Sequence, residues 1–549
     1  MKQKKWDSYG DTEFFWNGSA FENRAQSGQT YSKNVVQNYL AGAYYKIEEG
    51  KNIELDKDFP GFGNVDNNEE AAFRGVIVGT GEKLTLTGNN PLIVLSNGSV
   101  VKDINIVVNT ENDIVLTQST IMDSKNVYYK YDYRVGKNEK LKAYGAVMGK
   151  VLGGDNIIDN VSVSFGDSNI KLTGDYAQII PVGGYVGVVT KGSLIFRDME
   201  QYRSTDESEY NTFIGYDITK SNTDQARETI RTGGLIGQIK TVSSDMIAST
   251  GADHIDHNAI VEKCKVYNVD IFGHEVGGIV GACEQQDTYL GVFDTVVVSD
   301  KTTKSKIKGH SLNNATSGTR KYRGAGGILG CSQNMYNRFT VENCLVEGYT
   351  IESYRDAGGV VGSLDCISET KDNYDGKICN VKVKNVKLVS NERCGALVGY
   401  LYKNLSGYNI ITDSVQYKTY TDGSTLANYG NIVGYSNSTG KNIKIAGFSR
   451  KFANANNVST GFVQREQMVG NIGDAAAGSN NKPYGNDGYV IFADYNNVIT
   501  NTDASVANNS SPSNSTGYSN VAVNTYDIES GANSNNNYPN ATVNPKRIG

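Results

Sequence analysis

Apolar residues along this chain gather in a short glycine-framed segment that recurs between polar stretches of variable length. The segment occurs eight times, as GAVMG from Gly145, GGYVG from Gly183, GGLIG from Gly233, GGIVG from Gly277, GGILG from Gly326, GGVVG from Gly358, GALVG from Gly395 and GNIVG from Gly430. Consecutive copies begin 32 to 50 residues apart. Such a period is typical of repeat proteins, in which each unit buries its apolar face on its neighbours.

A second motif accompanies the first and places two apolar residues two positions apart, which is the period of a half-buried strand. Its copies are Val101–Ile106, Ile158–Val163, Val261–Val266, Phe293–Val298, Val341–Val346 and Ile378–Val383. After each of the last copies the phase jumps by three, as from Val266 to Val269, and then returns to two. The residue before the new strand is Asn268, Gly348 or Asn385. Asn and Gly tolerate a positive φ, so we expect a left-handed bend there.

Together these patterns predict an all-β fold, a right-handed parallel β-helix (β-solenoid) with a small, partly helical N-terminal cap. The leading glycines of the first motif would allow a sharp turn, and the closing glycine a close approach between coils. Helix is disfavoured because the motifs are β-branched, interrupted by glycine and lack a period of 3.6. A tandem array of separate small sandwiches is the alternative.

The predicted organisation has four parts. Residues 1–70 form the N-terminal cap, or the tail of a preceding domain, with a helix over 34–49; residues 71–465 form the repeat β-solenoid; residues 466–499 form C-terminal cap strands, the last over 488–493; residues 500–549 form an Asn/Ser-rich linker to a downstream region, as in a fragment of a longer protein. The polar stretches 201–231, 241–258, 300–323 and 369–377 are expected to be solvated insertions on one flank.

Charge and cysteine content narrow the possible partners. The net charge is -6, from 53 Lys and Arg against 59 Asp and Glu, so no basic excess points to nucleic acid. No run of 18 apolar residues predicts a membrane span, and Met1–Trp16 lacks the apolar core of an export signal. All seven cysteines lie between Cys264 and Cys394 without a CxxC pair. We expect core thiols stacked coil upon coil, with one or two disulfides left open for an exported array.

The Gly-Gly-apolar-apolar-Gly units over residues 70–465 resemble the GLUG repeats of bacterial surface proteins, most clearly GGLIG, GGIVG, GGILG and GGVVG. The resemblance implies an exported protein, extracellular or on the cell surface, whose repeats form a stalk or adhesive surface. Related repeats accompany zinc metalloproteases of the immunoglobulin A peptidase type, which need HExxH. Here His274-Glu275 is followed by Val276, Gly277 and Gly278, so the protease motif is absent.

Three groups of side chains are candidates for chemistry or binding. Parallel β-helices also host polysaccharide lyases and glycoside hydrolases, which use paired carboxylates; Asn222-Thr-Asp224 lies in a polar insertion, and Asp103, Asp159 and Asp294 recur beside turns, where capping and solvation explain them. Asp253, His254, Asp256 and His257 are metal-ligand types in one polar loop. Two tyrosine clusters, Tyr128, Tyr129, Tyr131 and Tyr133 and then Tyr402, Tyr408, Tyr417 and Tyr420, could stack on sugar rings or pack at strand ends.

These considerations favour a non-enzymatic stalk or adhesin module. We expect no catalytic residue, no resident metal and no cofactor, a monomeric state, and host or dietary glycans or surface proteins as partners. A β-helix polysaccharide lyase or glycoside hydrolase is the alternative function. Metal-dependent binding through His254 and His257 is a third hypothesis.

Overall fold

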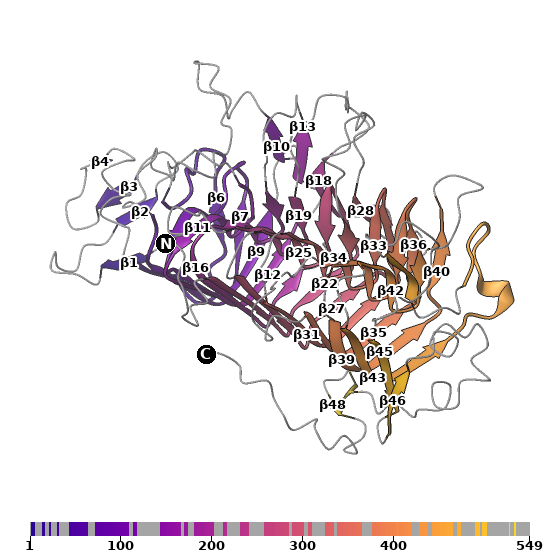
Figure 1. Ribbon diagram of the computed structural model, residues 1–549. Helices are drawn as coiled ribbons and strands as arrows, with labels where there is room; N and C mark the ends of the chain where they lie inside the picture. The colour runs from indigo at the N-terminus through magenta and orange to yellow at the C-terminus, as the bar shows by residue number, and fades with distance from the viewer. Residues whose placement is uncertain are drawn as a thin grey trace, which may run out of the picture.

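The structure is a computed structural model of the 549-residue chain. It describes residues 2–5, 14–16, 21–23, 30–31, 43–63, 72–108, 114–117, 143–165, 170–173, 181–201, 212–216, 231–240, 257–284, 288–300, 306–309, 324–333, 338–364, 376–402, 405–419, 428–437, 442–464, 469–473, 489–494, 497–501, 526–527 and 532–533. Most of these residues belong to strands, and most strands run side by side in parallel sheets along the molecule (Figure 1).

Four sheets, numbered here in the order in which the chain visits them, make up the array. Sheet 1 contains β1 (Lys2–Lys5), β5 (Ala43–Lys46), β6 (Ile53–Leu55), β7 (Val76–Leu86), β9 (Val100–Val108), β12 (Asp155–Ser164), β16 (Gly192–Arg197), β17 (Glu200–Gln201), β21 (His257–Glu262), β22 (Lys265–Tyr267), β26 (Thr288–Phe293), β27 (Val296–Val298), β31 (Arg338–Glu347), β35 (Gly376–Lys384), β39 (Leu405–Asp413), β43 (Asn442–Lys451), β45 (Tyr489–Asp494) and β46 (Asn497–Asn501).

The other three sheets have fewer strands than sheet 1. Sheet 2 contains β10 (Ile114–Thr117), β13 (Ile170–Thr173), β18 (Thr212–Tyr216), β23 (Val269–Gly273), β28 (Lys306–Gly309), β32 (Thr350–Ser353), β36 (Lys387–Val389) and β40 (Gln416–Lys418). Sheet 3 contains β14 (Val182–Gly183), β19 (Arg231–Gly233), β24 (Glu275–Gly277), β29 (Ala325–Gly326), β33 (Asp356–Gly358), β37 (Arg393–Gly395) and β41 (Tyr429–Gly430). Sheet 4 contains β8 (Ile93–Asn97), β11 (Met148–Gly153), β15 (Val186–Val189), β20 (Ile236–Lys240), β25 (Val280–Glu284), β30 (Leu329–Gln333), β34 (Val361–Leu364), β38 (Val398–Leu401), β42 (Val433–Asn437) and β44 (Val469–Gly473). Small antiparallel pairings involve β2 (Phe14–Trp16), β3 (Phe21–Asn23) and β4 (Thr30–Tyr31), and β47 (Tyr526–Asp527) with β48 (Ala532–Asn533).

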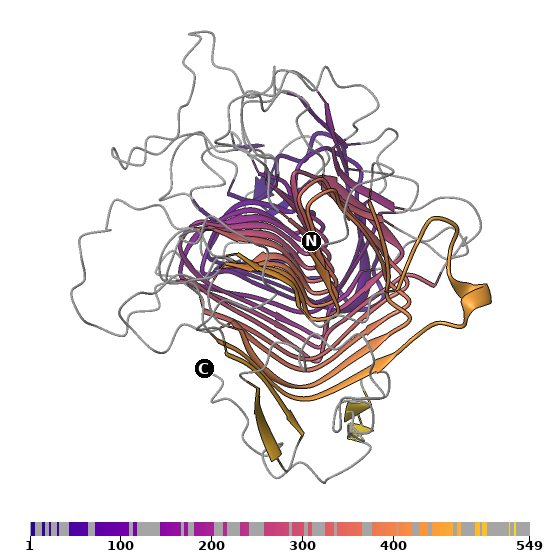
Figure 2. The same ribbon diagram turned by 45° about the vertical axis from the view of Figure 1, so that its right-hand side comes forward.

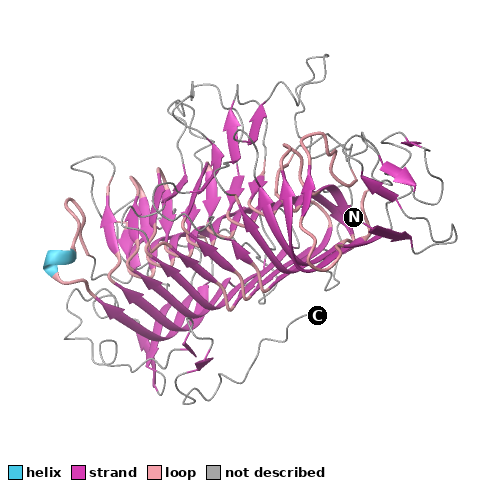
Figure 3. Ribbon diagram, turned by 180° about the vertical axis from the view of Figure 1, so that it is seen from behind, coloured by secondary structure: helices cyan, strands magenta, loops and turns pink. Residues whose placement is uncertain are grey.

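One passage through sheets 1, 2, 3 and 4 is called a coil. In a middle coil the chain runs from β31 through β32 and β33 to β34, and then β35 starts the next coil in parallel register on β31. Each glycine-framed motif pairs directly with the next, as β14 does with β19, so each sequence period makes one coil. This continuous parallel pairing confirms the all-β prediction and excludes separate sandwiches for the described coils (Figures 1 and 3).

The long polar stretches connect different pairs of sheets. Residues between β17 and β18 join sheet 1 to sheet 2, those between β18 and β19 join sheet 2 to sheet 3, and those between β20 and β21 join sheet 4 to sheet 1. The prediction that the insertions share one flank is therefore wrong, because they leave the coil at three different corners.

Sheet 1 bends at a column of residues with positive φ. The column comprises Asp103, Asn160, Asp198, Lys263, Asp294, Asn343, Asn380 and Asn409, with φ from 50° to 56°. Their side chains form a ladder between coils: Asn343 Nδ2 donates to Asp294 Oδ1 at 2.9 Å, and Asn380 Nδ2 donates to Asn343 Oδ1 at 2.9 Å. The bend that the phase jump predicted lies between sheets 1 and 2, and it is confirmed, since Asn268, Gly348 and Asn385 have φ of 53°, 78° and 53°.

The glycine-framed motif forms the turn between sheets 3 and 4, and its tip faces sheet 1. None of the eight motifs contributes a described glycine with positive φ, so the glycines are required by space. A Cβ at the closing Gly237 would lie 2.5 Å from Val182 N and 2.6 Å from Gly187 O of the preceding coil. A Cβ at Gly278, in the turn, would lie 2.8 Å from Val297 Cγ1 of sheet 1. The predicted close approach between coils is thus confirmed. The turn also lies close to sheet 1.

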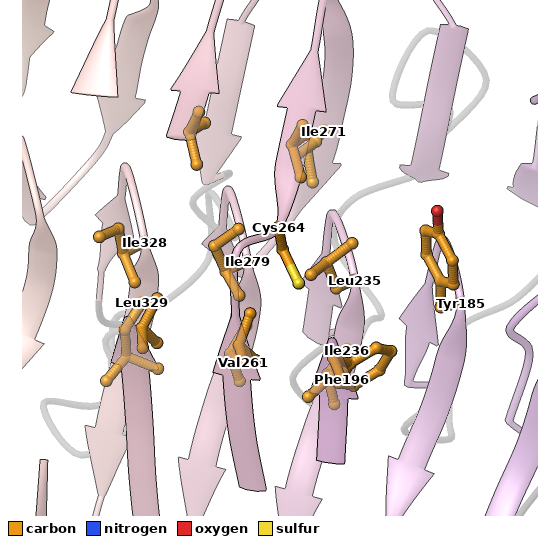
Figure 4. Packing of buried hydrophobic residues seen from close by; sticks show 14 of the residues in the cluster. Tyr185, Phe196, Leu235, Ile236, Val261, Cys264, Ile271, Ile279, Ile328 and Leu329 are labelled. Carbon is orange, nitrogen blue, oxygen red and sulfur yellow. The ribbon is translucent and has the colours of Figure 1, made fainter. Parts of the chain in front are cut away.

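The core is one continuous row of apolar side chains. Figure 4 shows Leu235, Ile279 and Ile328 from successive turns in line with Cys264 of sheet 1. Tyr185 holds the turn of its coil to the sheet 1 bend, because its hydroxyl donates to Val161 O and accepts from Val163 N, both at 3.1 Å. The six described cysteines, Cys264, Cys283, Cys331, Cys344, Cys379 and Cys394, are buried thiols, whereas Cys366 lies outside the described residues.

The two ends of the array differ from the sequence predictions. The described part of the predicted helix at 34–49 is the strand β5, which pairs in parallel with β7, and among the described residues the only helical element is η6 (Ala455–Asn457), a single 3-10 turn. The partly helical N-terminal cap is therefore wrong in its described part. At the other end, β45 lies where the last strand was predicted, but it is not the last, because β46 folds back on it and β47 and β48 follow.

Residues 452–464 cover the exposed edge of sheet 2. Tyr417 of β40 exchanges two backbone hydrogen bonds with Val463, at 2.8 and 2.9 Å, and the Gln416 side chain bonds to Asn457 O and Ser459 N. The loop that carries η6 extends from the orange end of the array in Figure 2. A covered strand edge cannot recruit another strand. The residues that cap the array therefore begin before residue 466, which is where the predicted C-terminal cap begins.

Candidate functional site

A column of buried ionisable side chains lies at the start of the sheet 3 strands. Arg231 and Glu275 are register partners in β19 and β24, and their side chains form an ion pair at 3.0 Å. Asp356 and Arg393 are partners in β33 and β37 and form an ion pair at 2.6 Å. Gly324, just before β29, occupies the rung between the two pairs.

These four side chains lie in the interior even though they are charged. The side chains of Glu275 and Asp356 are 1% and 0% exposed, and those of Arg231 and Arg393 are 5% and 8% exposed. The Arg393 guanidinium also lies over the ring of Tyr400, 4.0 Å from its centroid, and Tyr400 stacks on Tyr435 of the next coil. Opposite charges on neighbouring rungs offset the cost of burying each of them.

His274 lies next to the first ion pair. It is 3% exposed and directly precedes Glu275. Burial, together with the positive charge of Arg231, lowers the pKa of His274 to about 3. The imidazole is therefore neutral near neutral pH. It cannot act as a general acid that exchanges protons near neutral pH.

The carboxylates of this column resemble a glycosidase pair in spacing alone. Glu275 and Asp356 are two rungs apart, or about 9.6 Å along the stack at about 4.8 Å per rung, which approaches the separation in inverting glycosidases. Both are buried, however, and each is paired with an arginine. A carboxylate without solvent access cannot reach a glycosidic bond. The column is therefore a structural feature.

Three of the six described thiols are buried in a way that suppresses their reactivity. Burial raises the pKa of Cys264, Cys344 and Cys394 well above the usual thiol range. A protonated thiol is a poor nucleophile and a poor metal ligand. In the described part of the chain, no three His, Cys, Asp or Glu side chains gather in a group that could hold a metal ion.

The predicted metal ligands are mostly outside the described residues. His254 and Asp256 fall there, as do Asp253 and the tripeptide Asn222-Thr-Asp224. His257 is the first residue of β21 and pairs in register with Gly192 and Thr288. The hypothesis of metal binding through His254 and His257 stays a prediction.

The recurring aspartates have structural roles. Asp103 and Asp294 occupy the positive-φ bend of sheet 1, and each accepts a hydrogen bond from an asparagine of a later coil. Asp159 is one position earlier, where it pairs with Lys102 at 2.9 Å. The three are therefore not equivalent, and their observed role is contact between neighbouring coils, where capping and solvation were expected.

The tyrosines of the second cluster differ in exposure. Tyr417 is fully buried, and its hydroxyl lies 3.2 Å from Gly430 O and from Asn431 Oδ1, so of the two expected roles it has packing and cannot stack on a sugar ring. Tyr402 is partly exposed. The first cluster, Tyr420 and the side chain of Tyr408 lie outside the described residues.

The sequence analysis missed the ion-pair column, although the sequence contains a signal for it. A charged residue stands two positions before the first glycine of four motifs, as Arg231, Glu275, Asp356 and Arg393. A charge at a fixed place in an apolar motif indicates pairing with the neighbouring repeat.

Comparison with known proteins gives no further assignment. No protein-family model matches the sequence, and no curated protein and no solved structure is significantly similar to it. Within the described residues, no helix is both long and apolar enough to cross a membrane.

Proposed function

We propose that this chain is a right-handed parallel β-helix that serves as a non-enzymatic spacer or adhesin segment of a larger bacterial surface protein. The observation that supports the proposal best is the continuous parallel pairing of sheet 4, which the one register irregularity, between Val151 and Gly153 of β11, does not break. Its ten strands, from β8 to β44, all pair in parallel without a strand from elsewhere. The chain therefore builds length by repetition, and the buried thiols, His274 and the ion pairs of sheet 3 serve the core.

The spacer role follows from the geometry of the stack. Ten rungs have nine spacings of about 4.8 Å, so sheet 4 spans about 43 Å. Apolar contacts between coils and hydrogen bonds along every sheet resist bending and stretching together. Such a rod holds the regions at its two ends at a fixed distance.

The adhesin role rests on the outer surface. Outward charges vary from coil to coil, as Lys102, Asp159, Arg197 and Glu262 do on successive rungs, and the polar connections leave at three corners. Host or dietary glycans or surface proteins could bind such a surface without chemistry. The GLUG-like motifs support export, because similar motifs occur in surface proteins.

Removal of one whole coil tests the spacer role. Residues 326–357 extend from the first glycine of one motif to the residue before the first glycine of the next. We expect their deletion to leave a folded protein that is shorter by one rung, about 4.8 Å, in small-angle scattering. Deletion of the 16 residues 338–353, which removes β31 and β32 alone, is the control and should unfold the neighbouring coils. Equal disruption by both deletions would contradict the proposal.

A glycan panel tests the absence of catalysis. The protein is incubated with plant and host polysaccharides while reducing ends, unsaturated products and binding are measured. The proposal predicts at most binding. Turnover that is lost when an exposed carboxylate is replaced would establish the alternative, a lyase or hydrolase.

A further inference from the structure

An aliphatic stripe runs along the outer face of sheet 1 in its N-terminal half. The stripe consists of Val76, Val100, Ile157, Ile195 and Ile260, which are register partners on five successive rungs. All five are partly exposed, whereas their chain neighbours Ile77, Val101, Ile158, Phe196 and Val261 are fully buried. The five side chains therefore point away from the core. A single exposed aliphatic residue needs no explanation, but a contiguous ridge of five indicates a contact surface.

A charged row lies beside the stripe, two residues further along each strand. It consists of Lys102, Asp159, Arg197 and Glu262 on four successive rungs, so the charges alternate in sign. Lys102 pairs with Asp159 at 2.9 Å and is still 46% exposed. This charged row and the aliphatic stripe are separated by about 6.6 Å, the length of two residues in a strand.

Because its charges alternate in sign, the charged row is complementary to the same row of a second copy in which the order of rungs is inverted. A two-fold axis parallel to the strands, between the rungs of Ile157 and Ile195, would superimpose the face on a second copy with the order of rungs inverted. Lys102 would then face Glu262 of the other copy, and Asp159 would face Arg197 of the other copy. Every charge meets the opposite charge, which favours this partner over a surface of uniform sign.

The aliphatic stripe matches itself under the same axis. Val100 would lie on Ile260 of the other copy, and Ile157 on Ile195 of the other copy. The strand directions remain aligned, as in two sheets that pack face to face about 10 Å apart. Self-complementarity of this kind is what an isologous dimer requires.

We propose that sheet 1 carries a homodimerisation face, through which two copies of this chain pack side by side with their long axes antiparallel. Four spacings of about 4.8 Å by the two rows, each about 6.6 Å wide, give a footprint of about 250 Å² per copy. That size is at the small end for protein interfaces, so the dimer is weak and reversible. The inference replaces the expectation of a monomer and does not depend on the spacer or adhesin role.

Sedimentation velocity of the full chain, at concentrations up to about 1 mM, tests the proposal because an interface of this size binds weakly. We expect a concentration-dependent dimer that weakens with salt. Ile195→Lys should weaken association by at least about tenfold, since the substitution enters the interface twice. Ile411→Lys is the matched control, because Ile411 is a partly exposed residue of β39 in sheet 1, away from the stripe. A monomer at every concentration, or equal effects of the two substitutions, would overturn the proposal.

A sign inversion of the charged row identifies the partner. The quadruple variant Lys102→Glu, Asp159→Lys, Arg197→Glu, Glu262→Lys keeps the alternation within each chain. We expect it to dimerise with itself as the unchanged protein does, and to pair at least about tenfold less with the unchanged protein, because like charges then meet on all four rungs. Pairing between differently labelled chains is measured by fluorescence transfer. Equal pairing of the two forms would show that another surface holds the dimer.

Discussion

Replacement of the closing glycine of GGLIG, Gly237→Ala, tests whether the motif exists to bring backbones together. The new Cβ would lie 2.5 Å from Val182 N, 2.6 Å from Gly187 O and 2.7 Å from Val182 C. All three atoms belong to the backbone of the preceding coil, in β14 and β15. Real Cβ contacts are essentially never shorter than 3.0 Å, so these strands must move by at least 0.5 Å, which is the difference between 3.0 and 2.5 Å.

The cost follows from what that movement disturbs. Tyr185 N and Val186 N donate to Leu235 O at 3.1 and 2.9 Å across the same two coils. Overpacking of a core costs about 1–3 kcal/mol, and weakening of two hydrogen bonds adds about 1 kcal/mol each. The lower backbone entropy of unfolded alanine returns about 0.4–1 kcal/mol. We expect Gly237→Ala to lower the free energy of unfolding by about 2–4 kcal/mol.

Gly153→Ala is the matched control, because its Cβ would meet only the tip of the Asn97 side chain, at 3.0 Å. We expect this variant to stay within about 1 kcal/mol of the unchanged protein. Urea unfolding followed by circular dichroism gives the free energies, and peptide-level hydrogen exchange locates the loss to the coils around Gly237. Equal stability of the two variants would refute the assignment of the closing glycines to close backbone approach.

Three further predictions concern the buried polar groups. Arg231→Leu leaves Glu275 buried without its ion-pair partner and should cost about 3–5 kcal/mol in urea unfolding, whereas the double variant with Glu275→Leu should recover most of that loss. Because the pKa of His274 is lowered to about 3, the unfolded chain binds a proton that the folded chain refuses below pH of about 6.5. The free energy of unfolding should therefore fall as the pH drops from 6.5 towards 3, by up to about 1.4 kcal/mol per pH unit. His274→Gln should lack this part of the pH dependence. Asn343→Val places a β-branched residue at a φ of 56° and should be about 1–2 kcal/mol less stable than Asn343→Gly, which loses the same bond to Asp294.

Each of these predictions has a contradicting result. An Arg231→Leu variant with the same free energy of unfolding as the double variant Arg231→Leu, Glu275→Leu would show that the two buried charges do not depend on each other. Identical pH profiles of the unchanged protein and His274→Gln would show that the imidazole titrates in solvent. Equal stabilities of the two Asn343 variants would deny the strained backbone at the bend.

Local patterns of the repeat were readable from the sequence, because each one recurs under the same physical constraint. The phase jump after Val266 marks a bend at Asn268, and the left-handed backbone there favours Asn or Gly, although Ser414 occupies the same bend of a later coil with φ of 57°. The register of one repeat was off by one position. The sequence pattern placed Phe293 at the first inward position of this copy of the motif. In the structure Val292 occupies that position, and Thr295 stands where the other copies have an apolar residue or cysteine after the bend.

Features that depend on other parts of the chain were less accessible. Ala43–Lys46 lies in a segment rich in helix formers, yet pairing with β7 makes it a strand. Residues 452–464 cover β40 through backbone bonds that leave no apolar pattern. The ion pairs of sheet 3 connect residues 44 and 37 positions apart, from 231 to 275 and from 356 to 393, so only an alignment of the repeats with one another would have shown them.

The central claim is that successive repeats stack as parallel coils in one register, and paired cysteines test it most directly. Ser162 Oγ donates to Asn105 Oδ1 at 2.6 Å on the outer face of sheet 1, and Lys384 pairs with Glu347 at 2.7 Å further along. Neighbouring rungs are about 4.8 Å apart, within the range that a disulfide spans. The account predicts rapid cross-linking of Asn105→Cys with Ser162→Cys and of Glu347→Cys with Lys384→Cys, but none of Asn105→Cys with Asp159→Cys, three residues out of register. Cross-linking of the out-of-register pair, or failure of both in-register pairs in folded protein, would contradict it.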